Sequence, residues 1–172
     1  MRDFRFIIYF LLLIAAQMMM CNYFNLSQFI LITILPAMIL CTPIGLSTTY
    51  GILIAFATGF LVDFFSTGMI GLTSMALMPV ALLRNVVINL VFGEEVFARN
   101  EDISFARQGV PKMALATFIC TGIYFAVFIM AESAGTRPLW ADLLKYLLSS
   151  VLSTGISLFA VNILSPERSS RW

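Results

Sequence analysis

The feature that most constrains this chain is a stretch from Phe6 to Val62 without a single charged side chain. As one helix this stretch would extend about 85 Å, whereas the hydrocarbon core of a bilayer is about 30 Å thick. The stretch must therefore fold back on itself, and we expect it to form three membrane spans. Over the whole chain of 172 residues, 60% are hydrophobic and only 11% charged, against about 25% charged in soluble domains. The sequence predicts an all-α, polytopic membrane protein.

Polar residues, prolines and glycines divide the chain into six predicted transmembrane helices, which form one domain over residues 1–172. The predicted spans cover residues 4–21, 28–44, 47–65, 69–92, 110–131 and 142–164. Pro36 lies inside the second span, where we expect it to kink the helix. Residues 93–112 carry a cluster of charged side chains and are predicted to form a cytoplasmic loop.

The basic residues predict the orientation, because cytoplasmic segments of membrane proteins are enriched in Lys and Arg. With both termini in the cytoplasm, that side receives Arg2, Arg5, Arg99, Arg107, Lys112, Arg168 and Arg171. The opposite side receives only Arg137 and Lys145. We therefore expect a multi-pass protein with cytoplasmic N- and C-termini.

Residues that commonly carry catalysis or bind cofactors are scarce. The chain has no histidine, which removes the usual general base and the commonest metal ligand. Cys21, Cys41 and Cys120 have no metal-ligand spacing. An intramembrane aspartyl protease needs two carboxylates in one site, and only Asp63 lies well inside a predicted span. We expect no enzymatic activity and no cofactor or metal, and the net charge of +1 gives no reason to expect a nucleic-acid partner.

Asp63 lies near the outer end of the third span, where a charged side chain invites a functional hypothesis. Gly51, Ala55 and Gly59 precede it at spacings of four, so these four residues share one helix face. Small residues at this spacing allow another helix backbone to come close. We expect the face to pack the bundle or to receive a partner's helix. For Asp63 itself two roles stay open: capping the turn of residues 64–68, or binding a partner or a proton.

Arg84 is the second charge inside a predicted span. Counted from the turn between the two helices, Arg84 lies about 16 Å deeper than Asp63, which is too far for a direct pair. We expect its side chain to extend toward the cytoplasmic headgroups, or to bond to Asn85, Asn89 and the backbone near Pro79. Alternatively, the fourth span ends near Arg84, and residues 86–92 lie in the membrane interface.

The sixth span carries a ridge of serines at Ser149, Ser153 and Ser157. Their spacing of four places them on one helix face. We interpret this ridge as a packing face between helices rather than as a substrate site.

A short motif lies where the third span ends and the fourth begins. It reads Gly59-Phe60-Leu61-Val62-Asp63-Phe64-Phe65-Ser66, followed by Gly68, Gly71, Ser74 and Ala76. This pattern resembles the rod shape-determining protein MreD family, in which Gly-Leu-x-x-Asp closes one membrane helix and a glycine-containing turn opens the next. Here Phe60 follows the glycine. Thr73 stands where related sequences often have a histidine, so any role of that histidine is not transferred.

The resemblance implies a non-enzymatic inner-membrane scaffold subunit of the bacterial cell-elongation machinery, which builds peptidoglycan. Its implied partners are MreC, the RodA glycosyltransferase with its transpeptidase partner, and the MreB filament, together with membrane lipids and without a small-molecule substrate. The implied fold is similar to the substrate-binding subunits of energy-coupling-factor vitamin transporters. Such a subunit is also the alternative function. These subunits commonly dock through Ala-x-x-x-Ala in the first span, whereas here Ala15 and Ala16 are adjacent.

Overall fold

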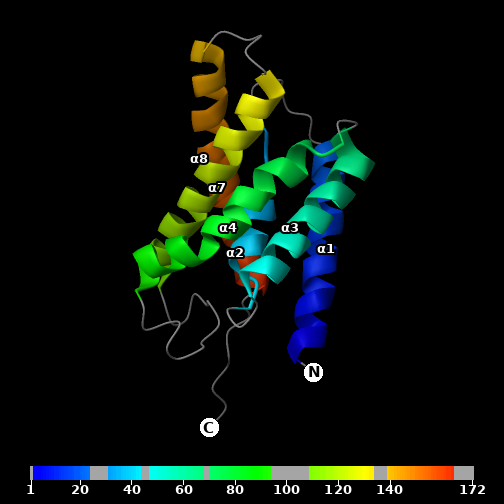
Figure 1. The fold of residues 1–172 in the computed structure, drawn as a ribbon, viewed down its shortest axis with the longest axis vertical. Helices are drawn as coiled ribbons and strands as arrows, with labels where there is room; N and C mark the ends of the chain where they lie inside the picture. The colour runs from blue at the N-terminus through cyan, green and yellow to red at the C-terminus, as the bar shows by residue number, and fades with distance from the viewer. Residues whose placement is uncertain are drawn as a thin grey trace.

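The computed structural model describes residues 2–23, 31–43, 47–67, 70–93, 109–133 and 139–164. Within these ranges every element of regular structure is a helix (Figure 1). The elements are α1 (Arg2–Tyr23), α2 (Leu35–Leu40), α3 (Thr48–Val62), the π-helical turn η1 (Asp63–Thr67), α4 (Leu72–Phe92), α7 (Val110–Ser133) and α8 (Leu139–Leu164). The prediction of an all-α protein is confirmed for the described part of the chain.

Four of these helical stretches are long and apolar enough to cross a membrane. They are Thr48–Phe65, Leu72–Phe92, Val110–Ser133 and Trp140–Val161, and α1 adds a shorter apolar stretch, Ile7–Asn22. Large hydrophobic side chains are exposed on every one of these helices, including Leu11, Phe60, Leu90, Met130 and Phe159. A surface of this kind is stable in lipid and unstable in water, so the structure is that of a helical membrane bundle.

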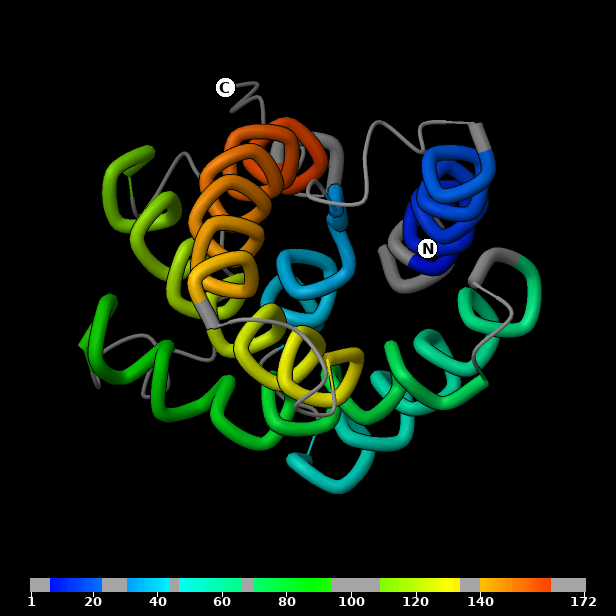
Figure 2. Tube along the Cα trace, turned by 90° about the horizontal axis from the view of Figure 1, so that it is seen from above, coloured from blue at the N-terminus to red at the C-terminus, as the bar shows by residue number. Residues whose placement is uncertain are grey.

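The bundle is built around α2, the shortest of the α-helices that the structure describes. Successive long helices pack as neighbours, α3 against α4, α4 against α7 and α7 against α8, and α2 contacts α4, α7 and α8. Seen from above, α2 lies in the centre and α1 stands at one side, next to α8 and α3 (Figure 2). All six residues of α2 are buried, so a segment from the uncharged N-terminal stretch forms the middle of the core.

Of the described residues in the predicted membrane helix 28–44, only residues 35–40 are helical. Residues 31–34 are not helical, and helix begins only at Leu35. Pro36 in the first turn of α2 gives the reason. A proline has no N–H group for the carbonyl four residues back, here that of Ile32, and its ring clashes with that carbonyl. Pro36 therefore starts a helix, as proline commonly does, and does not kink one.

The other helices begin and end within a few residues of their predicted ranges. η1 continues α3 by one turn, so that together they cover the third predicted span. Most of the predicted cytoplasmic loop 93–112, as well as Gly68 of the predicted turn motif, falls outside the described residues.

Candidate functional site

Asp63 caps the start of α4 with its carboxylate. The side chain is fully buried, and Oδ2 accepts hydrogen bonds from the backbone N–H groups of Gly71 at 2.9 Å, Thr73 at 3.0 Å and Ser74 at 3.4 Å. The first N–H groups of a helix have no partner inside the helix, and the helix dipole favours a negative charge beside them. The sequence suggested that Asp63 caps the turn of residues 64–68. In the structure its carboxylate instead stabilises the start of α4, which follows that turn.

Gly71 makes this cap possible through its backbone. It precedes α4 with φ +99°, in the left-handed region, which a glycine adopts without the steric cost that a side chain would impose. In this conformation its N–H group points at the carboxylate of Asp63. The predicted turn glycine thus belongs to the same unit as Asp63.

Gly59 lies against the backbone at the start of α4. A Cβ atom placed on Gly59 would lie 2.6 Å from Cα and 2.7 Å from N of Ser74. The hydroxyl of Ser74 in turn donates a hydrogen bond to the carbonyl of Phe56 at 3.3 Å. α3 and α4 therefore touch at a point where only a glycine fits.

The predicted face of Gly51, Ala55, Gly59 and Asp63 is buried along its whole length. Gly59 and Asp63 contact α4 of the same chain, so this part of the face packs the bundle and is not open to a partner's helix. Gly51 differs from Gly59, since an added Cβ at Gly51 would meet nothing within 4 Å. Of the two glycines on this face, only Gly59 lies in close contact with another helix.

Arg84 does not extend to the membrane surface as expected. Its side chain is only 4% exposed. Nε donates a hydrogen bond to the carbonyl of Leu40 at 3.2 Å, and Nη2 donates one to the carbonyl of Thr42. These carbonyls belong to the C-terminal end of α2, where the helix leaves acceptors unpaired and where a positive charge is favourable. The expectation of a snorkelling side chain is wrong because α2 ends within reach of Arg84.

The serine ridge of α8 binds the backbone of the non-helical residues 31–34. Ser149 Oγ accepts from the N–H of Leu31, and Ser153 Oγ accepts from the N–H of Thr33, both at 3.0 Å. Ser153 also donates to the carbonyl of Leu31 at 3.3 Å, and Ser157 donates to that of Thr33 at 3.2 Å. Serines four apart on a helix repeat every ~6 Å, and alternate residues of an extended chain repeat every ~6.6 Å. The two spacings nearly match, so successive serines of the ridge can hydrogen-bond to the backbone of alternate residues, Leu31 and Thr33.

Gln17 of α1 binds the opposite edge of the same segment. Its Nε2 donates to the carbonyl of Ile32 at 3.2 Å, and its Oε1 accepts from the N–H of Ile34 at 2.9 Å. The carbonyl of Ile32 is the one that Pro36 would leave unpaired in a helix. Gln17 is almost fully buried, and its carboxamide acts here as a neighbouring strand would. Backbone without helical bonds persists at membrane depth only where protein satisfies its polar groups, and Gln17 and the serines do so.

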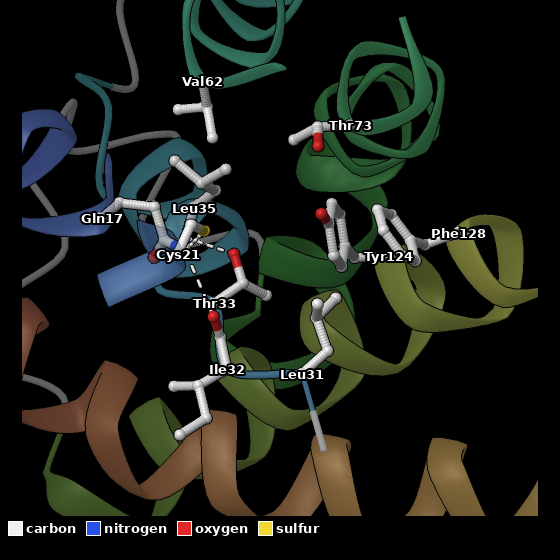
Figure 3. A pocket seen from close by; sticks show the side chains of 10 residues that line it. All are labelled: Gln17, Cys21, Leu31, Ile32, Thr33, Leu35, Val62, Thr73, Tyr124 and Phe128. Atoms are coloured by element: carbon white, nitrogen blue, oxygen red, sulfur yellow. Dashed lines mark hydrogen bonds between the residues drawn. The ribbon is translucent and has the colours of Figure 1, made fainter. Parts of the chain in front are cut away.

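A small cavity with a mostly apolar lining lies beside this segment (Figure 3). Its volume is about 20 Å³, and its lining is Gln17, Cys21, Leu31, Ile32, Thr33, Leu35, Val62, Thr73, Tyr124 and Phe128. The lining residues come from α1, the segment 31–35, α3, α4 and α7. A cavity of this size has room for one water molecule.

One ion pair joins the ends of α7 and α8. Lys145 Nζ lies 2.5 Å from Glu132 Oε2, and the Lys145 side chain is 6% exposed. Removing one partner of a buried pair leaves an uncompensated charge, which is strongly destabilising. The sequence did not reveal this pair, because Glu132 lies at the end of the fifth predicted span and Lys145 near the start of the sixth.

The described residues contain no group of three or more His, Cys, Asp or Glu side chains placed to hold a metal ion. Cys21, Cys41 and Cys120 are not joined in disulfide bonds. Comparisons with protein-family models, with curated proteins and with solved structures find no match for this chain.

Proposed function

We propose that this chain is a non-enzymatic scaffold subunit of the bacterial cell-elongation machinery in the inner membrane, similar to MreD proteins. The observation that carries the proposal is the contact between Gly59, Asp63, Gly71 and Ser74. These four residues belong to the motif that resembles the MreD family, and in this chain they form one connected joint between α3 and α4. A motif that fixes how two helices meet gives a rigid surface for other proteins, without supplying a reactive group.

The proposed topology has six passes, made by α1, the segment 31–43, α3, α4, α7 and α8, with both termini in the cytoplasm. In Figure 1 α1 begins and α8 ends in the lower half of the view, as this topology requires. Arg2 and Arg5 at the start of α1 and Lys112 at the start of α7 agree with a cytoplasmic lower end.

The second pass is short, and its extended part explains how it crosses. At about 3.3 Å per extended residue for residues 31–33 and about 1.5 Å per residue from Ile34, which has helical backbone angles, residues 31–40 reach about 20 Å, whereas a continuous helix of the same residues would reach about 15 Å. The extended stretch thus lets few residues cover most of the ~30 Å hydrocarbon core.

The rival function is that of a substrate-binding subunit in an energy-coupling-factor vitamin transporter. Binding a vitamin requires an enclosed site of roughly 300–1,000 Å³. The cavity beside residues 31–35 measures about 20 Å³, far below that size. The size of this cavity argues against a vitamin site at this place in the bundle.

The proposal is tested by crosslinking the tagged protein in native membranes, purifying it and identifying the attached proteins by mass spectrometry. We expect MreC, and with it RodA and its transpeptidase partner or MreB. Recovery of a transporter ATPase pair with its membrane coupling subunit would overturn the proposal. A tagged membrane protein of unrelated function, expressed at the same level, serves as the control for nonspecific capture.

A matched pair of variants connects the partners to the α3–α4 joint. Gly59→Ala places a methyl group against the backbone of Ser74, whereas Gly51→Ala places one in open space. We expect Gly59→Ala to reduce recovery of the partners and to disturb cell shape, while Gly51→Ala leaves both unchanged. If both variants recovered the partners equally well at equal protein levels, the α3–α4 joint would not be needed for partner binding.

A further inference from the structure

The guanidinium of Arg84 has hydrogen-bond donors that the end of α2 does not use. Its Nε and Nη2 donate to the carbonyls of Leu40 and Thr42, and the third nitrogen, Nη1, carries two further N–H groups. Nη1 makes no hydrogen bond with the described residues, and yet it is not one of their buried polar atoms that lack a partner. This nitrogen therefore reaches the protein surface, through the small part of the side chain that stays exposed.

The positive charge of Arg84 also has no counterion within the described part of the chain. The ion pair found there joins Lys145 and Glu132, whereas the hydrogen bonds of Arg84 go to neutral carbonyls. The C-terminal end of a six-residue helix such as α2 offers only partial negative charge. Because a charge removed from water is costly unless it is paired, an anion at Nη1 would complete the environment of Arg84.

Further donors lie near this nitrogen, at the start of α3. Asn85, the residue after Arg84, donates a hydrogen bond to the hydroxyl of Thr48 at 3.2 Å, so the Thr48 hydroxyl keeps its own proton to donate. Ser47 precedes α3 and forms no side-chain cap, although the first N–H groups of a helix have no partner inside it. Such groups bind anions. The start of α3 and Nη1 of Arg84 thus favour the same kind of ligand.

The depth of these donors in the membrane indicates where the anion comes from. The span Thr48–Phe65 has 18 residues, and a helix of that length covers about 27 Å of the ~30 Å hydrocarbon core. Thr48 therefore lies at the boundary between hydrocarbon and headgroups, where the phosphate groups of lipids are found. Leu53 of α3 and Leu82 of α4, which lie further into the span, are exposed and face the acyl chains.

We propose that Nη1 of Arg84 and the start of α3 bind the phosphate group of an anionic phospholipid. Nη1 donates to one phosphate oxygen, and the hydroxyl of Thr48 with the first N–H groups of α3 donates to the others. Arginine suits this position because its planar fork bonds to the carbonyls of α2 and to a phosphate at the same time. The lipid supplies the counterion of Arg84. Its binding requires no partner protein, so the site is separate from the scaffold function.

The test is a titration of the delipidated protein in detergent with phosphatidylglycerol, followed by native mass spectrometry. Diacylglycerol with the same acyl chains lacks the phosphate, and we expect it to bind at least about tenfold more weakly. Equal binding of the two lipids would overturn the proposal. Inorganic phosphate at the same concentration should not displace phosphatidylglycerol. If it did, the site would be one for a free anion and not for a lipid.

Two variants and a control locate the bound lipid. Arg84→Gln removes the charge but keeps an N–H donor for a carbonyl of α2, and Thr48→Val removes a hydroxyl at the exposed start of α3. We expect the Kd for phosphatidylglycerol to rise at least about tenfold in Arg84→Gln and about threefold in Thr48→Val. Lys112→Met, which removes an exposed charge at the start of α7, should keep the original Kd.

The outcomes separate a specific site from general attraction to positive charge. An unchanged Kd in either Arg84→Gln or Thr48→Val contradicts the proposal, and so does an equal rise in Lys112→Met. Thr48 is exposed, so Thr48→Val decides the question by itself if Arg84→Gln does not fold.

Discussion

Gly59 of α3 is in direct contact with the backbone of Ser74 of α4, where an added Cβ atom would lie 2.6 Å from Ser74 Cα. Four residues after Gly59, the carboxylate of Asp63 accepts hydrogen bonds from the N–H groups of Thr73 and Ser74. Gly59 therefore sets how closely α4 approaches α3, and Asp63, one turn further along, holds the N-terminal end of α4 in place. The consequences for stability can be measured residue by residue.

Adding a methyl group at Gly59 should separate the two helices. The clash is with backbone atoms, which cannot rotate away, so Gly59→Ala should lower the free energy of unfolding by about 1–3 kcal/mol. Gly51→Ala in the same helix meets open space and should raise stability by up to about 1 kcal/mol, because alanine favours helix over glycine. Chemical or thermal unfolding in detergent measures both. Equal effects at the two glycines would show that α3 and α4 do not meet as described.

Replacing Asp63 by Asn should weaken the cap of α4. Asparagine keeps one carbonyl acceptor but loses the negative charge beside the helix N-terminus, so we expect a loss of about 0.5–2 kcal/mol. Asp63→Ala should cost more, because the N–H groups of Gly71 and Thr73 then have no side-chain acceptor. Asp142→Asn, at a half-buried position in the first turn of α8, is the matched control. A control variant as unstable as Asp63→Asn would argue against a specific cap.

Replacing Arg84 by Met should loosen the C-terminal end of α2. The carbonyls of Leu40 and Thr42 lose their donors, and unpaired buried acceptors cost about 1–3 kcal/mol each. Besides the loss of stability, we expect faster reaction of Cys41, which lies between these two residues, with a thiol reagent. Lys112→Met at the exposed start of α7 is the control. An unchanged labelling rate of Cys41 in a folded Arg84→Met variant would contradict the contact.

The serine ridge predicts an order of effects along α8. Ser153 makes two hydrogen bonds to residues 31–34, whereas Ser149 and Ser157 make one each. Ser153→Ala should therefore cost about 1–3 kcal/mol, about twice the cost of the other two variants. Unfolding in detergent measures these differences.

Thr154→Ala is the control for the ridge, because the Thr154 hydroxyl donates to the carbonyl of Ser150 within α8 and lies outside the ridge. We expect it to leave the extended segment unchanged. Hydrogen exchange at the N–H of Thr33 should accelerate most in Ser153→Ala. An identical exchange rate in all four variants would rule out the ladder of bonds between α8 and residues 31–34.

Local signals were enough to locate the α3–α4 joint. The chemistry of three residues explains their roles: Gly59 lets two backbones approach closely, Asp63 accepts backbone hydrogen bonds, and Gly71 adopts a positive φ. The signal for the broken second segment was also present, since Pro36 inside an apolar stretch leaves a carbonyl unpaired. Its interpretation as a kinked helix failed because the partners of that carbonyl lie in other helices. A buried glutamine and a serine ridge elsewhere in the chain were the sign that such partners exist.

The sequence by itself determined that this chain is a helical membrane protein and where most of its helices begin and end. Hydropathy and helix-breaking residues act over one span at a time, so they can be read along the chain. Only the tertiary structure decided which groups Arg84, Gln17 and the serines bind. Leu31 and Ser149 meet across 118 positions of the sequence, and their pairing depends on how the bundle closes around α2. In a membrane core without water, every exposed backbone group must find such a partner, and the fold selects which one.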